Sequence, residues 1–342
     1  MTIPALPDLA NVRVLVTGSA GFIGFHTCSQ LLQAGATVLG VDNFSDYYDV
    51  ELKEARNRIL ANHRQFQLAR ISIEDRPDIA AAWRDFRPDI VIHLAAQAGV
   101  RYSIDQPDSY IGTNIVGTYH LLELARHDPV RHLLIASTSS VYGANTKMPF
   151  DENQATRTPL SLYAATKGAT ELMGHSYSHL YRTPMTFFRF FTVYGPWGRP
   201  DMALFKFADA IERGEPIDIY NNGYMVRDFT FIDDLAGSIV RLTQAVPGDV
   251  PVDGDSLSAV APFRVVNIGG GTPTPLLDYV AALEAALGKT AQRNLMPMQK
   301  GDVHATEASP ELLRRLTGTV PQTGVAEGVG AFVRWYRENR QA

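Results

Sequence analysis

The chain of 342 residues contains only one cysteine, Cys28, so an internal disulfide is impossible. A single thiol fits a reducing compartment, and we therefore expect a cytoplasmic protein. Cys28 falls within an apolar, helix-like stretch, which favours a small buried side chain over a reactive thiol. Without disulfides, stability must come from a hydrophobic core, and a chain of this length can bury a large one.

Long apolar runs and an excess of positive charge are also absent. No apolar run approaches the roughly 20 residues needed to cross a bilayer, so no membrane association is expected. The N-terminal MTIPALPDLANVR lacks the basic start and apolar centre of a signal peptide and predicts a short polar arm. The net charge is −5 without a basic tail, which argues against nucleic acid as a partner. Phosphate groups would have to be bound by a few well-placed residues.

Short apolar runs alternate with helix-like stretches through the first half of the chain. The runs are VRVLVTG, TVLGVD, FQLAR, DIVIHLAA, HLLIAST and MTFFRFF. Helices are expected over about 21–34, 51–60, 114–126 and 163–180. Continuous apolar strands separated by helices predict a parallel sheet with both faces covered. Right-handed crossovers then give a doubly wound, Rossmann-like α/β fold.

The character of the sequence changes after about residue 193, where Pro and Gly become frequent, as in GPWGRPD and GGGTPTP. This change predicts a smaller α/β lobe over the carboxyl edge of the sheet. We therefore expect a sheet domain over 1–192 and the second lobe mainly over 193–342. A strand and helix at about 228–247 could return to the sheet, and 248–262 is typical of a surface loop.

A glycine-rich turn, GSAGFIG, stands between the strand VRVLV and the first helix. Gly18 permits a tight turn, Gly21 lets the backbone approach a pyrophosphate, and Gly24 lets helix and strand pack closely. The N–H groups of Phe22 and Ile23, at the start of the helix, then face the phosphates. Three glycines alone are weak evidence, but their position favours a dinucleotide site over a purely structural turn.

An acidic residue, Asp42, ends the second strand, 18 residues beyond Gly24. A carboxylate there accepts hydrogen bonds from the adenosine ribose and repels a 2′-phosphate, which favours NAD over NADP. A helix cap is the less favoured alternative. His93 is more typical of a hydrogen-bonded core histidine than of a catalyst. Further NAD contacts are expected from Asn43, from Asp75 or the pair Ser72 and Ile73 at the adenine, and from Ala95 and Ala96.

A Y-x-x-x-K motif, Tyr163 to Lys167, opens a predicted helix. Residues four apart share a helix face, and a nearby ammonium would lower the pKa of the phenol, as would the positive nicotinamide ring. Tyr163 could then take a proton from a sugar hydroxyl as hydride leaves the carbon, while Lys167 holds the nicotinamide ribose. The motif alone often marks a solvated helix face. The hydroxyl run Ser137 to Ser140 alone could be ordinary turn chemistry, because Ser and Thr bond their own backbone. Together with the glycine-rich turn and this run, the Y-x-x-x-K motif favours a catalytic role.

These features together resemble the extended short-chain dehydrogenase/reductase superfamily over nearly the whole chain. The segments DNFSDYYDVELKEAR, HLAAQAGVRYS, RFFTVYGPWGRPDMA and RDFTFIDD further resemble the UDP-glucuronate 4-epimerase family. The resemblance implies an isomerase that interconverts UDP-glucuronate and UDP-galacturonate with tightly bound, recycled NAD. It implies hydride loss from C4, rotation of the 4-keto sugar, and hydride return to its opposite face.

The same resemblance assigns residues to the sugar. Thr138 would bond the sugar 4-hydroxyl and assist Tyr163. The 4-ketone lies β to the C5 carboxylate, so this carboxylate must be held to prevent loss of CO₂. Relatives that decarboxylate carry an acid where this chain has Ser140, and epimerases of uncharged sugars carry Asn in place of Thr192. Ser139, Ser140, Thr192 and Arg199 are therefore expected to bind the carboxylate; an exposed loop position is an equal alternative for Arg199.

The nucleotide would be bound mainly by the second lobe. The resemblance implies that Arg227 holds the pyrophosphate and Asp302 the uridine ribose. Related epimerases carry an Arg near Gly301, where this chain has Gln299 and Lys300. The second phosphate contact is therefore open between Lys300 and Arg101, and Arg101 is also a plausible substrate residue. No metal is expected, and the family implies a homodimer through helices 114–126 and 163–180.

Three alternatives remain. A UDP-hexose 4-epimerase is disfavoured by Thr192, and a UDP-glucuronate decarboxylase is disfavoured by Ser140. A non-catalytic NAD-binding protein would have no need for Tyr163, Lys167 and Thr138 together.

Overall fold

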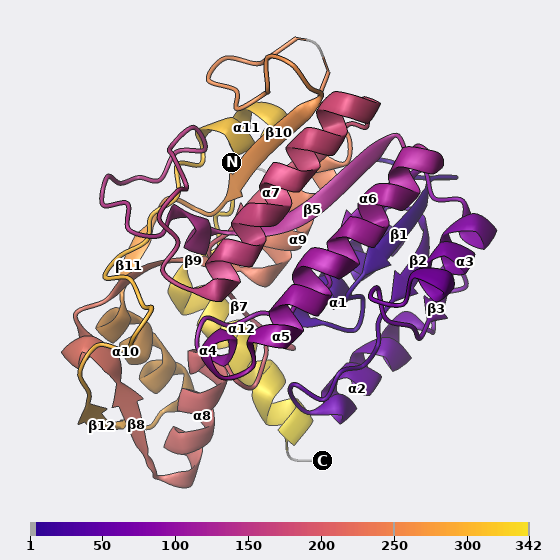
Figure 1. The fold of residues 1–342 in the computed structure, drawn as a ribbon. Coiled ribbons are helices and arrows are strands. Elements are labelled where there is room, and N and C mark those ends of the chain that lie inside the picture. The colour runs from indigo at the N-terminus through magenta and orange to yellow at the C-terminus, as the bar shows by residue number, and fades with distance from the viewer. Residues whose placement is uncertain (1–4, 249, 341–342) are drawn as a thin grey trace.

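A sheet of seven parallel strands forms the centre of the molecule (Figure 1). The computed structural model describes residues 5–248 and 250–340. Across the sheet lie β3 (Phe66–Ala69), β2 (Thr37–Val41), β1 (Arg13–Thr17), β4 (Ile90–His93), β5 (His132–Thr138), β6 (Met185–Phe190) and β10 (Phe263–Ile268). The strand order reverses direction between β1 and β4, and doubly wound sheets bind their ligands at the carboxyl ends of the strands at this point. The predicted Rossmann-like fold is confirmed.

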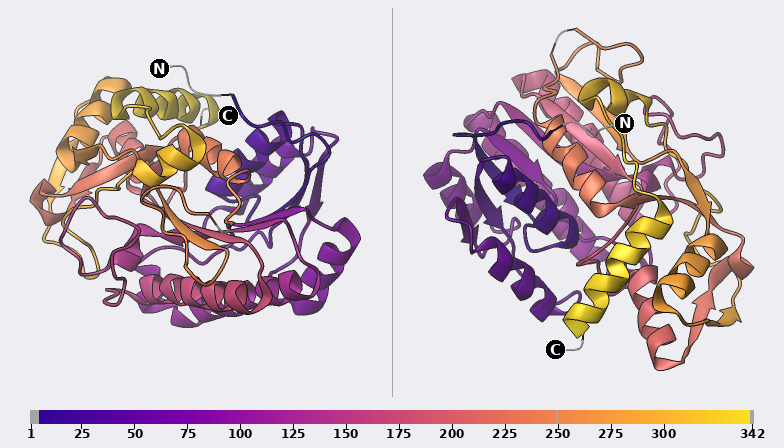
Figure 2. Two further views of the ribbon diagram at one scale, coloured as in Figure 1. Left: turned by 90° about the horizontal axis from the view of Figure 1, so that it is seen from above. Right: turned by 180° about the vertical axis from the view of Figure 1, so that it is seen from behind.

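Side chains alternate between the two faces of the sheet, as the two-residue period of a strand requires. Val14 and Val16 enter one hydrophobic cluster, whereas Leu15 between them enters the other. Helices cover both faces because both are apolar, which gives the three layers visible in Figure 2. The first cluster includes residues of α1 (Phe22–Gln33), α9 (Ile232–Leu242) and α11 (Glu311–Thr317), and the second includes residues of α3 (Arg76–Phe86), α6 (Thr118–His127) and α7 (Leu162–Tyr181).

Capping side chains fix where several of the helices begin. Asp49 accepts a hydrogen bond of 2.9 Å from Glu51 N at the start of α2 (Val50–Leu60). Ser161 Oγ accepts one of 3.1 Å from Ala164 N at the start of α7. The helix expected over 114–126 begins as a π-helical segment, η1 (Ile111–Gly117), and continues as α6. The cap of α7 therefore fixes the start of the helix that carries the Y-x-x-x-K motif.

A smaller lobe is built around two short sheets. Its helices include α8, α10 and α12. The remaining elements are α4 (Tyr102–Asp105), α5 (Pro107–Tyr110), η2 (Ser139–Tyr142), β7 (Thr192–Tyr194), α8 (Ala203–Arg213), β8 (Pro216–Ile219), η3 (Tyr220–Gly223), β9 (Val226–Phe231), β11 (Pro273–Pro275), α10 (Leu276–Leu287), β12 (Gln292–Leu295) and α12 (Val325–Arg340). Strands β11, β9 and β7 form one sheet, and β12 pairs with β8 in the other.

The chain returns to the sheet domain after the small lobe begins. Helix α9 packs beside α1, where Gln30 Nε2 donates to the carbonyl of Asp233 at 2.9 Å. Strand β9, expected to return with this helix, pairs with β7 and β11 instead, and the returning strand is β10. The division at residue 192 stays a prediction. Within residues 5–248 and 250–340, no helix is both long and apolar enough to cross a membrane.

Candidate active site

The carboxyl ends of β1, β4 and β5 bring three predicted motifs to one edge of the sheet. Thr17 at the end of β1 pairs with His93 at the end of β4, and β5 lies beside β4 and ends at Thr138. The glycine-rich turn follows β1, residues 95–99 follow β4, and the hydroxyl run closes β5. His93 is buried and contacts Thr17 Oγ1 at 2.7 Å and Thr118 Oγ1 at 3.0 Å, as a core histidine does. Burial lowers its pKa to about 3.

Two glycines of the turn are required by its shape. Gly18 has a φ of +73°, and a Cβ there would lie 2.8 Å from Ala95 N. A Cβ on Gly24 would lie 1.9 Å from the carbonyl oxygen of Gly18. Gly21 directly precedes α1, so the N–H groups of Phe22 and Ile23 in the first helical turn have no intrahelical acceptor. The turn therefore presents free donors at a helix N-terminus, a suitable site for a pyrophosphate.

Asp42 connects the end of β2 with this turn. Its Oδ2 accepts from Ala20 N at 3.0 Å and its Oδ1 from Phe44 N at 2.8 Å. Each carboxylate oxygen retains a second lone pair for a ribose hydroxyl. The helix-cap alternative is wrong, because α2 begins at Val50 with Asp49 as its cap. Asn43 accepts from Ser45 N at 3.0 Å and stabilises the same loop.

The residues proposed for the adenine end have local structural roles. Asp75 caps α3 by accepting from Asp78 N at 3.2 Å. The buried Ile73 packs against η1, and its carbonyl contacts His120 Nδ1 at 3.0 Å. Ser72 Oγ accepts from Glu74 N at 3.3 Å. Contacts of these residues, and of Ala95 and Ala96 after β4, with a cofactor stay a prediction.

The first turns of α7 place Tyr163 next to Thr138. The two side chains share a hydrogen bond, and Ser140 N donates to Thr138 Oγ1 at 3.2 Å. Burial raises the pKa of Tyr163, while the Thr138 bond and the charge of Arg199 oppose this. A lowering of this pKa by Lys167 stays a prediction. Burial of Lys167, which is only 2% exposed, lowers its own pKa to about 8.

A buried ion pair behind these residues was missed from the sequence. Glu171, one turn beyond Lys167, accepts from Arg189 Nε at 3.0 Å and from Arg189 Nη2 at 2.7 Å. Ser137 Oγ donates to the same carboxylate at 2.5 Å. The pair joins α7 to β5 and β6, so it fixes Tyr163 relative to Thr138, and the Glu171 charge opposes the lowering of the Lys167 pKa. The i+4 spacing from Lys167 was the only signal available in the sequence.

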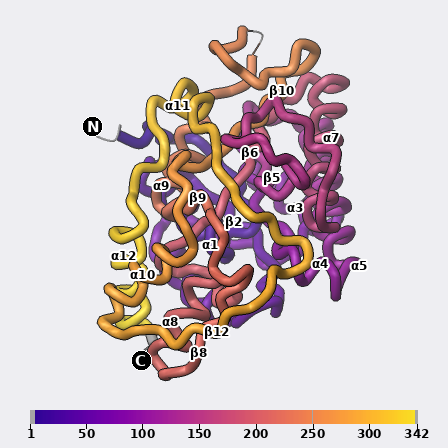
Figure 3. The backbone as a smooth tube through the Cα atoms, turned by 90° about the vertical axis from the view of Figure 1, so that its left-hand side faces the viewer, coloured from indigo at the N-terminus to yellow at the C-terminus, as the bar shows by residue number. Residues whose placement is uncertain are grey.

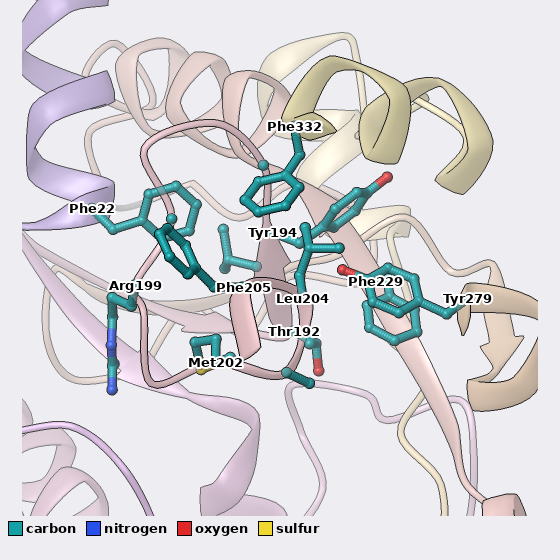
Figure 4. Close-up of a pocket in the computed structure, with 14 residues that line it drawn as sticks. Phe22, Thr192, Tyr194, Arg199, Met202, Leu204, Phe205, Phe229, Tyr279 and Phe332 are labelled. Atoms are coloured by element: carbon teal, nitrogen blue, oxygen red, sulfur yellow. The ribbon is translucent and has the colours of Figure 1, made fainter. Parts of the chain in front are cut away.

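Arg199 and Thr192 point to the same side of the small lobe (Figure 4). The guanidinium is bound by Asp201, with Nε–Oδ1 at 2.9 Å and Nη2–Oδ2 at 2.5 Å, and lies 5.5 Å from the ring of Tyr47. Tyr47 OH donates to Asp201 Oδ2 at 3.2 Å. Arg199 is thus a partly buried, paired residue, and the solvent-exposed alternative is wrong. Asp201 and Tyr47 were missed as site residues, although both fall in segments that carry the family resemblance, because nothing in the sequence shows that these two segments meet.

Arg227 on β9 and Asp302, in the segment after β12, lie close enough for the charge of Asp302 to act on Arg227. Arg227 donates to the carbonyls of Val303 at 2.8 Å and His304 at 3.2 Å, and burial lowers its pKa against the opposing charge of Asp302. Asp302 also pairs with Arg101 at 3.7 Å. Figure 3 shows this part of the chain running from β12 past α4. The structure therefore groups Arg101, Arg227 and Asp302, three residues predicted for the nucleotide. Lys300, the other candidate for a phosphate contact, is exposed. Ser139, predicted for the carboxylate, lies in η2.

An apolar pocket beside Arg199 does not extend this site. Aromatic side chains from β7, β9, α8, α10 and α12 line it, and its free volume is about 40 Å³ (Figure 4). That volume admits a water molecule or two and is far too small for a nucleotide sugar. We interpret it as a packing gap between the lobe and Phe22 of α1. Across the described ranges, no group of three or more His, Cys, Asp or Glu side chains could hold a metal ion.

The chain belongs to the NAD dependent epimerase/dehydratase family, whose model matches residues 14–254. A probable UDP-glucuronate 4-epimerase of Rhizobium meliloti (strain 1021) is 54% identical over 333 residues, which cover 96% of this chain and 98% of that protein. A UDP-glucuronic acid 4-epimerase from Bacillus cereus, solved with UDP-glucuronic acid and NAD, is similar with a TM-score of 0.84 at 32% identity, covering 96% and 99% of the two chains. A UDP-glucose 4-epimerase from Thermotoga maritima, solved with UDP-glucose, has a TM-score of 0.81 at 29% identity, covering 96% and 100%.

Proposed function

We propose that the chain is an NAD-dependent isomerase that interconverts UDP-glucuronate and UDP-galacturonate at C4. The observation that carries this proposal is the hydrogen bond between Tyr163 and Thr138 at the carboxyl end of β5, which is followed by Ser140 in place of an acid. The charge of Arg199 acts on Tyr163, so a base and a cation that could bind a carboxylate lie near each other. The relatives named for UDP-glucuronate 4-epimerase activity, which cover nearly the whole chain, support the same choice.

The residues at the sheet edge fit NAD. The free N–H groups of the glycine-rich turn suit the pyrophosphate, the Asp42 carboxylate suits the adenosine ribose, and Lys167 suits the nicotinamide ribose. When bound, NAD supplies a hydride acceptor that later returns the hydride, so no external oxidant is consumed. The protein's task is to hold the sugar and move one proton.

Tyr163 takes the proton of the sugar 4-hydroxyl as C4 is oxidised, and gives it back when C4 is reduced. Thr138 positions this hydroxyl through its hydrogen bond with Tyr163. Burial of Tyr163 raises its pKa, so nearby positive charge, from Arg199 and from the cofactor ring, favours the phenolate. Epimerisation then requires rotation of the 4-keto sugar before C4 is reduced from the other face.

The C5 carboxylate must be retained while the 4-ketone exists, because a β-keto acid loses CO₂ readily. Arg199 provides positive charge, and Thr192 with Ser139 and Ser140 provides neutral hydroxyl donors. None of these groups repels a carboxylate. Arg227 and Asp302 would bind the pyrophosphate and the uridine ribose, and Arg101 pairs with Asp302 beside them.

An assay of the purified protein without added NAD tests this function. UDP-glucuronate should be converted to UDP-galacturonate, as followed by NMR of the product mixture. UDP-xylose as the only product would establish a decarboxylase, and reaction of UDP-glucose but not UDP-glucuronate would establish a UDP-hexose 4-epimerase. Tyr163→Phe should nearly abolish turnover but retain substrate binding, since only the ionisable hydroxyl is lost; near-normal activity would contradict its role as the base.

The proposed homodimer would form through the face made by η1, α6 and α7. Apolar side chains are exposed along these neighbouring helices: Ile111, Val116, Tyr119, Leu172, Leu180 and Tyr181. Leu172, which is 76% exposed, lies near the middle of α7. Leu172→Glu should yield monomers in sedimentation experiments, whereas Leu295→Glu on β12 should not. A wild-type monomer would contradict the proposal. The cytoplasmic location also stays a prediction.

A further inference from the structure

The carboxylate of Asp201 occupies one edge of the Arg199 guanidinium. It accepts from Nε at 2.9 Å and from Nη2 at 2.5 Å, the two-point geometry that planar guanidinium and carboxylate groups favour. Burial alone would lower the pKa of Arg199, but the Asp201 charge reverses this and raises it. The arginine is therefore held as a fixed cation that has one edge already filled.

Tyr47, in the segment between β2 and α2, also holds Asp201. Its hydroxyl donates to Asp201 Oδ2 at 3.2 Å and lies 3.5 Å from Arg199 Nη2. A Cβ on Gly99 would lie 2.9 Å from this hydroxyl, so the loop after β4 also packs closely against it. The tyrosine ring lies 4.7 Å from that of Tyr102. Asp201 is thus fixed by Arg199 and by Tyr47, which itself packs against the loop after β4.

Part of the Arg199 guanidinium is left without a hydrogen-bond partner in the described part of the chain. Nη1 of Arg199 has no partner among residues 5–248 and 250–340, and the Arg199 charge is felt at Tyr163. Figure 4 shows the Arg199 and Thr192 side chains directed to the same side, away from the aromatic cluster. An incoming carboxylate would therefore meet the remaining donors of an arginine that cannot change its direction freely.

We propose that Asp201, held by Tyr47, is a positioning residue that orients Arg199 toward the C5 carboxylate of a UDP-uronate. The inference rests on the proposed function. Without Asp201 the arginine would gain rotamer freedom and would have to be ordered again by each substrate. The substrate carboxylate would then be held in several orientations, and loss of CO₂ would compete better with return of the hydride. Asp201 thereby contributes to specificity without contacting the sugar.

Asp201→Asn tests the inference, because it removes the charge and keeps the shape. We expect KM for UDP-glucuronate to rise on the order of tenfold, as for loss of one charge-assisted contact, and the decarboxylated fraction of product to increase. Asp201→Glu, which keeps the charge, should change KM and the decarboxylated fraction less than Asp201→Asn does. Asp85→Asn, an exposed substitution in α3, should change neither KM nor the decarboxylated fraction. A purely structural role would lower stability or kcat without changing the product ratio.

Two outcomes overturn the inference. One is an Asp201→Asn protein with wild-type KM and wild-type product ratio. If that variant does not fold, Tyr47→Phe, which removes only the donor to Asp201, serves as the test. It must raise KM and the decarboxylated fraction by less than is expected for Asp201→Asn. The second outcome that overturns the inference is an unchanged product ratio in Tyr47→Phe. Failure of the proposed function would be seen separately, since wild-type protein would then not convert UDP-glucuronate.

Discussion

The buried pair of Glu171 and Arg189 makes a demanding prediction about stability. The two side chains are 8% and 4% exposed, and their closest atoms lie 2.7 Å apart. Glu171→Gln leaves the guanidinium without a charge partner inside the protein and weakens the bond from Ser137. Breaking a buried pair from one side costs about 3–5 kcal/mol, far more than the pair's net contribution, because the remaining charge stays desolvated.

Denaturant unfolding of the NAD-loaded protein measures this cost. Glu171→Gln should lower the free energy of unfolding by about 3–5 kcal/mol. Glu54→Gln, which breaks the more exposed pair with Arg70 at 2.7 Å, should cost at most about 1 kcal/mol. The comparison separates burial from distance, because both pairs have the same closest approach.

A double variant tests the physical reason. Glu171→Leu with Arg189→Met replaces both charges by apolar groups and should cost less than either single change, because no unpaired charge remains. Our reasoning would be refuted by a cost below about 1 kcal/mol for Glu171→Gln, or by a double variant that costs the sum of the two single changes.

Three further predictions follow from the structure. Gly24→Ala should reduce the amount of bound NAD and lower the free energy of unfolding by about 1–3 kcal/mol, because its Cβ would lie 1.9 Å from the Gly18 carbonyl oxygen. Gly324→Ala, whose Cβ would meet nothing within 4 Å, should retain NAD. Extraction of the cofactor measures the bound NAD, and denaturant unfolding measures the stability. Burial raises the pKa of Glu152 to about 7, above its unfolded value near 4.5, so this group's stabilising contribution is lost as pH rises from about 4.5 to 7. Glu152→Gln should remove that part of the pH dependence in unfolding experiments, and an unchanged slope would contradict it. The Glu171 charge raises the low pKa of Lys167, so Glu171→Gln should move the alkaline limb of kcat/KM to lower pH; an unmoved limb would show that Lys167 ionisation does not limit the reaction.

Local patterns in the sequence accounted for much of the fold and for the outline of the site. Apolar runs with helix-like stretches between them predicted six of the strands in the large sheet, because buried parallel strands need apolar side chains on both faces. The spacing of Gly18 and Gly24, and of Tyr163 and Lys167, depends only on local backbone geometry and was therefore visible in the sequence. The sequence did not predict that β10 joins the large sheet while β9 joins the small one. Either strand is apolar enough for the large sheet, and only packing distinguishes them.

Contacts between distant segments depended on the folded chain. Tyr47 and Asp201 are 154 residues apart, yet they meet around Arg199, and their letters carry no pattern that predicts it. The Glu171 carboxylate meets Arg189 because α7 lies over β5 and β6, and the charge of Glu171 opposes the lowering of the Lys167 pKa by burial. The sequence therefore specified which chemical groups are available and the local shapes that present them. Tertiary packing set their distances and their solvent exposure, on which pKa and orientation depend.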